Sequence, residues 1–297
     1  MVFDLKSAWR FARDLVAGLT KDRVGLISAG IAFYGLLSIF PAITAIMAVG
    51  GLLTEPAALV DEMRQLGSVL PEEAMNIIVG QATEIAGSQS GGLGMAALIG
   101  LGLSIYAASK AVGALIAGIH IAAGEQDDRG FLASTIFIMA MTVLVIGLAV
   151  LALMATVVVP AVFAALGFDG WVAAILGLVR WPILGLATAF GLGGLYRLSL
   201  RHRTPPAPWV TPGAIVATVL WLAGSIVFSI YVRQFADYNK TFGTLGGVVS
   251  LLVWMWLSAF IGLLGEKVNT LMAERTLQKP LPGADKSLVQ RSSPGIS

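Results

Sequence analysis

The fold is decided by residues 212–269, which read PGAIVATVLWLAGSIVFSIYVRQFADYNKTFGTLGGVVSLLVWMWLSAFIGLLGEKVN. Two apolar runs, from about Pro212 to Val232 and from Gly247 to Leu264, lie on either side of a short polar segment. Each is close to the 20 or so residues with which an α-helix crosses a bilayer. The segment between them contains glycines, which suit a tight connection. The stretch therefore predicts a transmembrane hairpin whose second helix ends at the carboxylate of Glu266.

The composition of the whole chain extends this prediction. Of its 297 residues, 57% are hydrophobic and only 12% are charged, about half the charged fraction of an ordinary soluble domain. The apolar runs are continuous, whereas the strands of a transmembrane barrel alternate apolar with polar residues. The chain has no cysteine, which excludes disulfides and cysteine-ligated metals. The sequence therefore predicts an all-α polytopic membrane protein.

The apolar runs predict six spans, with further segments outside them. Residues 1–23 combine an apolar face with basic residues, which is typical of a helix in the headgroup layer; an alternative is a solvated helix packed on the protein's own loops. Residues 54–91 are acidic and predict two short amphipathic helices that cap one end of the bundle. Residues 276–297 have the composition of a disordered tail. The predicted spans are about 24–53, 93–122, 131–166, 171–195, 212–232 and 247–267.

Lysine and arginine are distributed unevenly over this topology. On a six-span model, 13 of the 19 fall on the side of the two termini and 3 on the opposite side. Basic residues are enriched in cytoplasmic loops. The distribution therefore predicts cytoplasmic N and C termini, with segment 54–91 and the polar turn at 237–246 facing the periplasm.

Several short motifs stand out along the chain. They are Pro-Gly-Ala at 212–214, Tyr-Asn followed by Thr-Phe-Gly-Thr-Leu-Gly at 238–246, and Leu-Gly-Glu followed by Asn at 264–269. In the first run, Ala-Gly-Ile-Ala-Phe-Tyr at 29–34 continues to Ser-Ile-Phe-Pro at 38–41. These motifs resemble those of the YihY/BrkB family of bacterial inner-membrane proteins. The resemblance covers about residues 8–275 and implies an inner-membrane protein. It does not define an activity, although some members have carried a ribonuclease label.

Three charged residues lie in or at the predicted spans. Lys110 is in the middle of the second span, Arg180 is in the fourth, and Glu266 is at the inner end of the sixth. A charge inside a bilayer costs about 2.5–3.5 kcal/mol on insertion scales and is usually functional or paired. One hypothesis is a polar cavity between helices that attracts an anion; the alternative is that Glu266 neutralises Lys110 or Arg180. The other predicted lining residues of the cavity are Tyr34, Tyr106 and Asn269.

The polar turn between the last two spans has two interpretations. It is an outer gate whose backbone amides face a solute, or it is a connector in which polar side chains and glycines stabilise the turn. The residues of the predicted gate are Tyr238, Asn239, Thr241, Gly243 and Gly246.

The sequence contains no recognisable catalytic motif. Its two histidines are far apart, and it has neither a phosphate-binding glycine-lysine loop nor a nucleophile elbow. We therefore expect no enzymatic activity, no cofactor, no metal and no nucleic-acid partner. The favoured function is transport or lipid handling, with an anionic lipid or a small anionic solute as partner. The alternatives are an envelope assembly factor without transport, and a proton- or cation-coupled carrier that uses Glu266.

Overall fold

Every regular element in the described part of the computed structural model is an α-helix, which confirms the all-α class. Most of the predicted cap at 54–91, and residues 278–297 of the predicted tail, lie outside the described residues. The structure describes residues 5–50, 79–80, 83, 93–165, 171–200, 208–242 and 244–277. The helices are α1 (Leu5–Lys21), α2 (Val24–Gly50), α5 (Leu93–Ala123), α6 (Phe131–Ala165), α7 (Trp171–Ser199), α8 (Pro212–Phe242) and α9 (Thr244–Leu277).

Several of these helices are long and apolar enough to cross a membrane. Within the described residues, three segments meet this criterion: Leu98–Ala123, Phe131–Leu148 and Gly246–Thr276. Helices α1 and α2 form a fourth if they are taken as one span bent by 57°. The structure therefore supports a multi-pass membrane protein, and the count of six spans stays a prediction.

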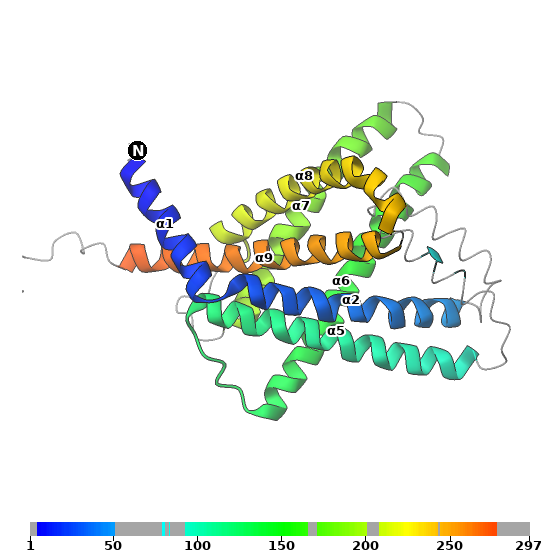
Figure 1. The fold of residues 1–297 in the computed structure, drawn as a ribbon, viewed down its shortest axis with the longest axis horizontal. Coiled ribbons are helices and arrows are strands. Elements are labelled where there is room, and N and C mark those ends of the chain that lie inside the picture. The colour runs from blue at the N-terminus through cyan, green and yellow to red at the C-terminus, as the bar shows by residue number, and fades with distance from the viewer. Residues whose placement is uncertain are drawn as a thin grey trace, which may run out of the picture.

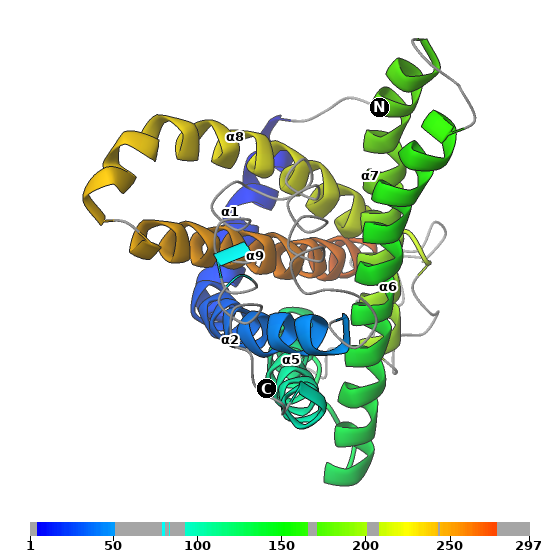
Figure 2. The same ribbon diagram turned by 90° about the vertical axis from the view of Figure 1, so that its right-hand side faces the viewer.

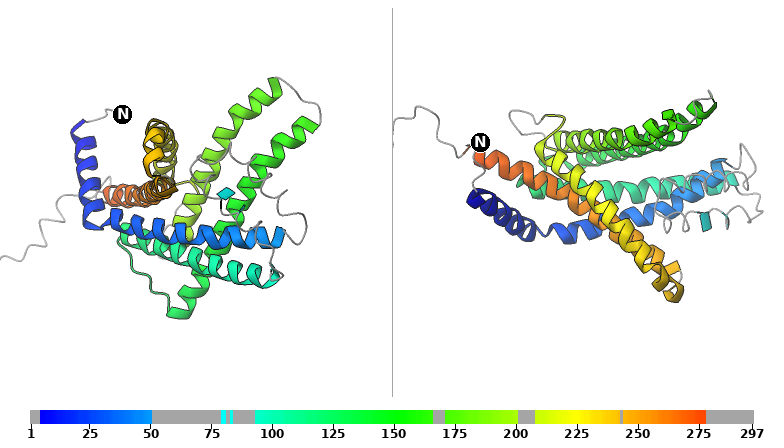
Figure 3. Two further views of the ribbon diagram at one scale, coloured as in Figure 1. Left: turned by 45° about the vertical axis from the view of Figure 1, so that its right-hand side comes forward. Right: turned by 90° about the horizontal axis from the view of Figure 1, so that it is seen from above.

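Helix α9 lies at the centre of the arrangement (Figures 1 and 2). It packs against α1, α2, α5 and α8. Helices α2 and α5 run side by side along it, and α8 crosses it obliquely, as Figure 3 shows from above. Helices α6 and α7 form a hairpin on one side of this group (Figure 2). Helix α1 and the last turns of α9, which lie nearest the two termini, meet at one end of the bundle (Figure 1).

The main buried cluster lies toward this same end of the bundle. Small residues allow the close approach: a Cβ on Gly118 of α5 would lie 2.9 Å from Leu263 of α9 and 3.0 Å from Ile27 of α2. Three helices therefore meet here with little space between them. The buried members of the cluster are Val24, Ile119, Tyr196, Leu200, Ala214 and Leu263.

The last two helices extend further than their apolar runs predicted. Helix α8 continues ten residues past Val232 to Phe242, and α9 begins at Thr244. The predicted polar turn at 237–246 is therefore mostly helical, and Gly243 lies outside the described residues. The reason is that hydropathy marks where a helix leaves hydrocarbon, whereas backbone hydrogen bonding continues through polar residues beyond that depth.

Candidate functional site

The N-terminus of α8 begins with a capping residue that hydropathy does not reveal. Thr211 Oγ1 accepts a hydrogen bond from the backbone N–H of Ala214 at 3.0 Å. The Thr211 carbonyl accepts one from the N–H of Ile215 at 3.1 Å. Pro212 follows at the first helical position, where a missing N–H costs nothing. This local sequence sets where α8 starts and directs its first amides toward α9.

Asn269 of α9 connects this N-terminus to a buried carboxylate. Its Oδ1 accepts a hydrogen bond from the Gly213 N–H at 2.7 Å. Its Nδ2 donates to Thr211 Oγ1 and to Glu266 Oε2, each at 3.0 Å. Glu266 is 0% exposed. The carboxylate thus has an amide donor and lies beside the positive end of α8, both of which stabilise a negative charge.

Two glycines bring α8 and α9 into backbone contact at this point. A Cβ on Gly213 would collide with the Gly265 carbonyl oxygen and with Asn269. A Cβ on Gly265 would lie 2.7 Å from both the Gly213 carbonyl oxygen and Tyr196 Oη. Tyr196 Oη donates to the Gly262 carbonyl at 2.6 Å, which adds α7 to the contact. We call Tyr196, Thr211, Gly213, Gly265, Glu266 and Asn269 the polar junction.

Lys110 lies far from the polar junction. Lys267, the neighbour of Glu266, donates to the Ala122 carbonyl of α5 at 3.3 Å, so Glu266 is level with the end of that helix. Lys110 is twelve residues earlier, which corresponds to about 18 Å along a helix. The predicted pairing of Glu266 with Lys110 is therefore wrong, because the two residues lie at different depths in the bundle.

Lys110 lies instead on the exposed face of α5. Its Nζ is 5.1 Å from the centre of the Tyr106 ring, a cation–π contact. Both side chains are exposed, Tyr106 by 59%. Apolar side chains continue this face at helical spacing, so that the ammonium group interrupts an otherwise apolar surface. We call Ile99, Leu103, Tyr106, Lys110 and Ile121 the α5 stripe.

The remaining predicted residues are not brought to one site. Tyr34 is exposed and packs edge-on against Phe33, and the adjoining Leu36 contacts Leu251, about 22 Å along α9 from Glu266. Gly246 is in the first turn of α9. The side chains of four others lie outside the described residues: Arg180 in α7, and Tyr238, Asn239 and Thr241 in α8.

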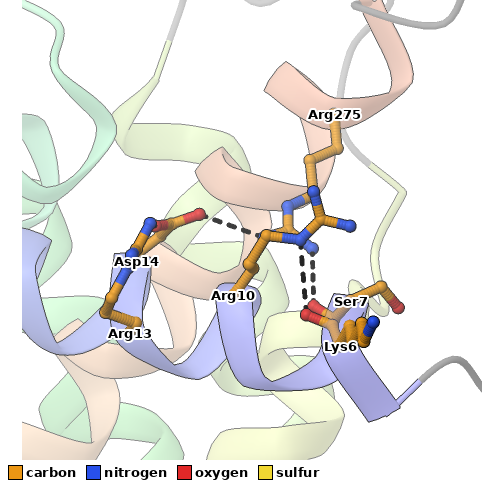
Figure 4. Close-up of polar contacts among 6 residues, drawn as sticks. All are labelled: Lys6, Ser7, Arg10, Arg13, Asp14 and Arg275. Carbon is orange, nitrogen blue, oxygen red and sulfur yellow. Dashed lines mark hydrogen bonds and ion pairs between the residues drawn. The ribbon is translucent and has the colours of Figure 1, made fainter.

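Helix α1 is attached to α9 by two ion pairs. Lys267 Nζ lies 2.7 Å from Asp22 Oδ2, and both side chains are largely buried. Arg275 Nη2 lies 3.1 Å from Asp14 Oδ2 (Figure 4). The Arg275 guanidinium carbon also lies 4.8 Å from the centre of the Phe11 ring. Helix α1 is therefore packed on the bundle through its acidic residues, which leaves most of its basic residues pointing outward.

Of the polar junction, sequence reasoning assigned only Glu266 and Asn269 to a candidate site. Gly213 and Gly265 were part of the family motifs without a role, and Tyr196 and Thr211 were missed. Thr211 has the recognisable signal of a capping residue before a proline at the start of a helix. Tyr196 has no such signal, because its partner is a backbone carbonyl 66 residues away. Among the residues that the structure describes, no group of three histidines or acids could hold a metal ion.

Comparison with known proteins agrees with this helical membrane architecture. Residues 15–287 match the family described as virulence factor BrkB. YfkH of Bacillus subtilis (strain 168), named as ribonuclease-like, is 26% identical over 92% of this chain and 97% of its own length. A UPF0761 membrane protein of Vibrio vulnificus (strain YJ016) is 24% identical over 94% of this chain and 87% of its own. No solved structure matches. The chain belongs to the BrkB virulence factor family of membrane proteins.

Proposed function

We propose that this membrane protein binds an anionic amphiphile at Lys110 and moves it between membrane environments. The observation that carries the proposal is an exposed ammonium group on the α5 stripe, in the middle of a helix that is otherwise suited to hydrocarbon. Such a cation is unfavourable in a bilayer unless an anion accompanies it. An amphiphile supplies that anion and covers the apolar residues beside it.

The position of Lys110 along α5 makes escape to water difficult. Helix α5 runs from Leu93 to Ala123, so Lys110 is 17 residues from its start and 13 from its end. These separations are about 26 and 20 Å, whereas half of the hydrocarbon core is about 15 Å. A lysine side chain is much shorter than either distance, so its charge stays within the hydrocarbon layer.

The surroundings of Lys110 fit an amphiphile better than a small solute. The Tyr106 ring contacts the ammonium from one side and leaves its other N–H donors available to a phosphate or carboxylate. Leu103, which is 54% exposed, and Ile99, which is 56% exposed, continue the same face and would contact an acyl chain. The substrate class that follows is a lipid-like anion.

The distribution of basic residues supports one orientation in the membrane. We propose an inner-membrane location with cytoplasmic termini, because basic residues concentrate on the side that contains α1 and the end of α9. On this topology the end of α5 at Ala123 lies on the cytoplasmic side, and Lys110 lies between the two leaflets.

The carrier that uses Glu266 as a titrating group is less well supported. The carboxylate is fully buried, receives a hydrogen bond from Asn269 and lies beside the start of α8. This arrangement favours a structural role, in which the buried side chain holds α8 and α9 together. Glu266→Gln in a liposome flux assay separates the two roles, since a carrier predicts the loss of pH-dependent flux in a correctly folded variant.

Native mass spectrometry of the protein released from its own membranes tests the binding part of the proposal. We expect Lys110→Gln to retain one anionic lipid-like molecule fewer than the wild type. Lys21→Gln, which removes an exposed lysine of α1, is the matched control and should retain as many as the wild type. Equal retention in all three proteins, or retention in none of them, would contradict binding at Lys110.

A further inference from the structure

The elbow between α1 and α2 has a surface feature that the proposed function does not use. There, a groove of about 320 Å³ is formed by Val16 and Leu19 of α1, Arg23 and Leu26 at the elbow, and Phe260 of α9. We propose that this groove holds the phosphate group and part of one acyl chain of an anionic phospholipid. The inference does not depend on Lys110, which lies on the exposed face of another helix.

The charge in the groove comes from Arg23. Its backbone has φ 52°, in the left-handed region that residues other than glycine seldom adopt. Its carbonyl accepts hydrogen bonds from the N–H groups of Leu26 at 3.0 Å and Ile27 at 3.1 Å, which hold the elbow in this form. An uncommon backbone conformation that the surrounding contacts maintain is typical of binding and hinge positions.

Arg23 has an exposed side chain and no ion pair with a described residue. The acid next to it, Asp22, is already paired with Lys267 at 2.7 Å. Asp14, which lies within α1, is paired with Arg275 at 3.1 Å. A positive charge thus stays available at the mouth of the groove, and a phosphate is the anion that a guanidinium binds best.

The apolar rim of the groove identifies the anion as a lipid. Val16 is 63% exposed and Leu26 is 69% exposed, and both lie on the groove. The Phe260 ring forms part of its wall and stacks on Trp256 at 5.5 Å between centroids. A free phosphate would leave these side chains uncovered, whereas an acyl chain covers them. The basic, amphipathic α1 suits the headgroup layer and the apolar α2 suits hydrocarbon, so the elbow between them suits the boundary of the two regions.

Photocrosslinking with a defined lipid tests this site. The full chain is reconstituted in phosphatidylcholine nanodiscs that contain a trace of photoactivatable phosphatidylglycerol, and crosslinked peptides are mapped by mass spectrometry. We expect crosslinks in segment 16–26 and at Phe260. Arg23→Gln should reduce them at least about tenfold, as expected for the loss of a charge-assisted hydrogen bond. Arg23→Lys should keep part of the signal, because the charge is retained.

Matched variants test whether the crosslinking at the elbow depends on Arg23 specifically. Arg10→Gln removes an exposed arginine about 20 Å away along α1 and should leave the elbow crosslinks unchanged. Lys110→Gln should also leave them unchanged, which separates this site from the one proposed on α5. If Arg23→Gln does not fold, Leu26→Asn keeps the charge, removes the apolar rim and should lower the crosslinking by itself.

Three results would overturn the inference. They are equal elbow crosslinks from photoactivatable phosphatidylcholine, full crosslinking in both Arg23→Gln and Leu26→Asn, and displacement of the lipid by millimolar inorganic phosphate. The first two would mean that ordinary surrounding lipid contacts the elbow. The third would mean that the groove recognises a free anion.

Discussion

The contact between α8 and α9 gives the sharpest prediction about stability. In Gly265→Ala the new methyl group would lie 2.7 Å from the Gly213 carbonyl oxygen and from Tyr196 Oη, and 2.8 Å from Ala217 Cβ. Ordinary contacts of such an atom begin at 3.4 Å, so the three neighbours must retreat by roughly 0.7 Å. Two of them belong to α8 and one to α7, so the substitution pushes both helices away from α9.

The expected cost follows from this displacement. Overpacking of a well-packed site costs about 1–3 kcal/mol. Separating α8 from α9 also stretches the 2.7 Å hydrogen bond from the Gly213 N–H to Asn269, whose loss costs about 1 kcal/mol more. Against this, replacing glycine by alanine inside a helix stabilises the folded state by about 1 kcal/mol, because alanine has the higher helix propensity. The net destabilisation of Gly265→Ala is therefore about 1–3 kcal/mol.

Gly102→Ala provides the control with identical chemistry. Gly102 is also inside a helix, but a Cβ there meets no atom within 4 Å, so the substitution should be neutral or stabilise by up to about 1 kcal/mol. Reversible unfolding by sodium dodecyl sulfate in mixed micelles, followed by tryptophan fluorescence, measures both variants. We expect the two free energies of unfolding to differ by about 1–4 kcal/mol. Equal stabilities would refute the backbone contact between α8 and α9.

Three further substitutions test other contacts. Asn269→Ala removes one hydrogen-bond donor to the buried Glu266 carboxylate and the acceptor of the Gly213 N–H, and should lower the free energy of unfolding by about 2–4 kcal/mol in the same assay. A double-mutant cycle of Asp22→Asn and Lys267→Gln should give a coupling energy of about 1–3 kcal/mol; a value near zero would mean that the ion pair does not hold α1. Tyr106→Ala should weaken retention of an anionic lipid by native mass spectrometry, whereas Tyr106→Phe should preserve it because the ring remains; equal retention would exclude the ring contact with Lys110.

The sequence predicted the helices better than their ends and contacts. Continuous apolar runs locate helices because unpaired backbone groups are too costly in hydrocarbon. The extension of α8 to Phe242 was missed, since polar residues beyond the hydrocarbon carry no hydropathy signal. The spacing of Glu266 and Asn269 placed them on one face, and the structure brings them within 3.0 Å.

Which face of each helix packs against its neighbours was harder to predict. An apolar membrane helix has no strong periodicity, so nothing in the sequence showed whether Lys110 pointed toward Glu266 or away from it. The exposure of Tyr34 could not be predicted for the same reason. Gly213 and Gly265 are 52 residues apart, and their contact depends on how α8 crosses α9, a property of the packed bundle.

The most direct test of the proposed function is the movement of an anionic lipid between the leaflets of proteoliposomes. The assay follows fluorescent phosphatidylglycerol by quenching from outside with dithionite, in vesicles that contain wild type, Lys110→Gln or Lys110→Arg. We predict that the wild type moves the lipid between leaflets faster than protein-free vesicles do. Lys110→Gln should lower this rate by at least about tenfold, and Lys110→Arg should keep most of it. A wild-type rate equal to that of empty vesicles, or a Lys110→Gln rate equal to wild type, would contradict the proposal.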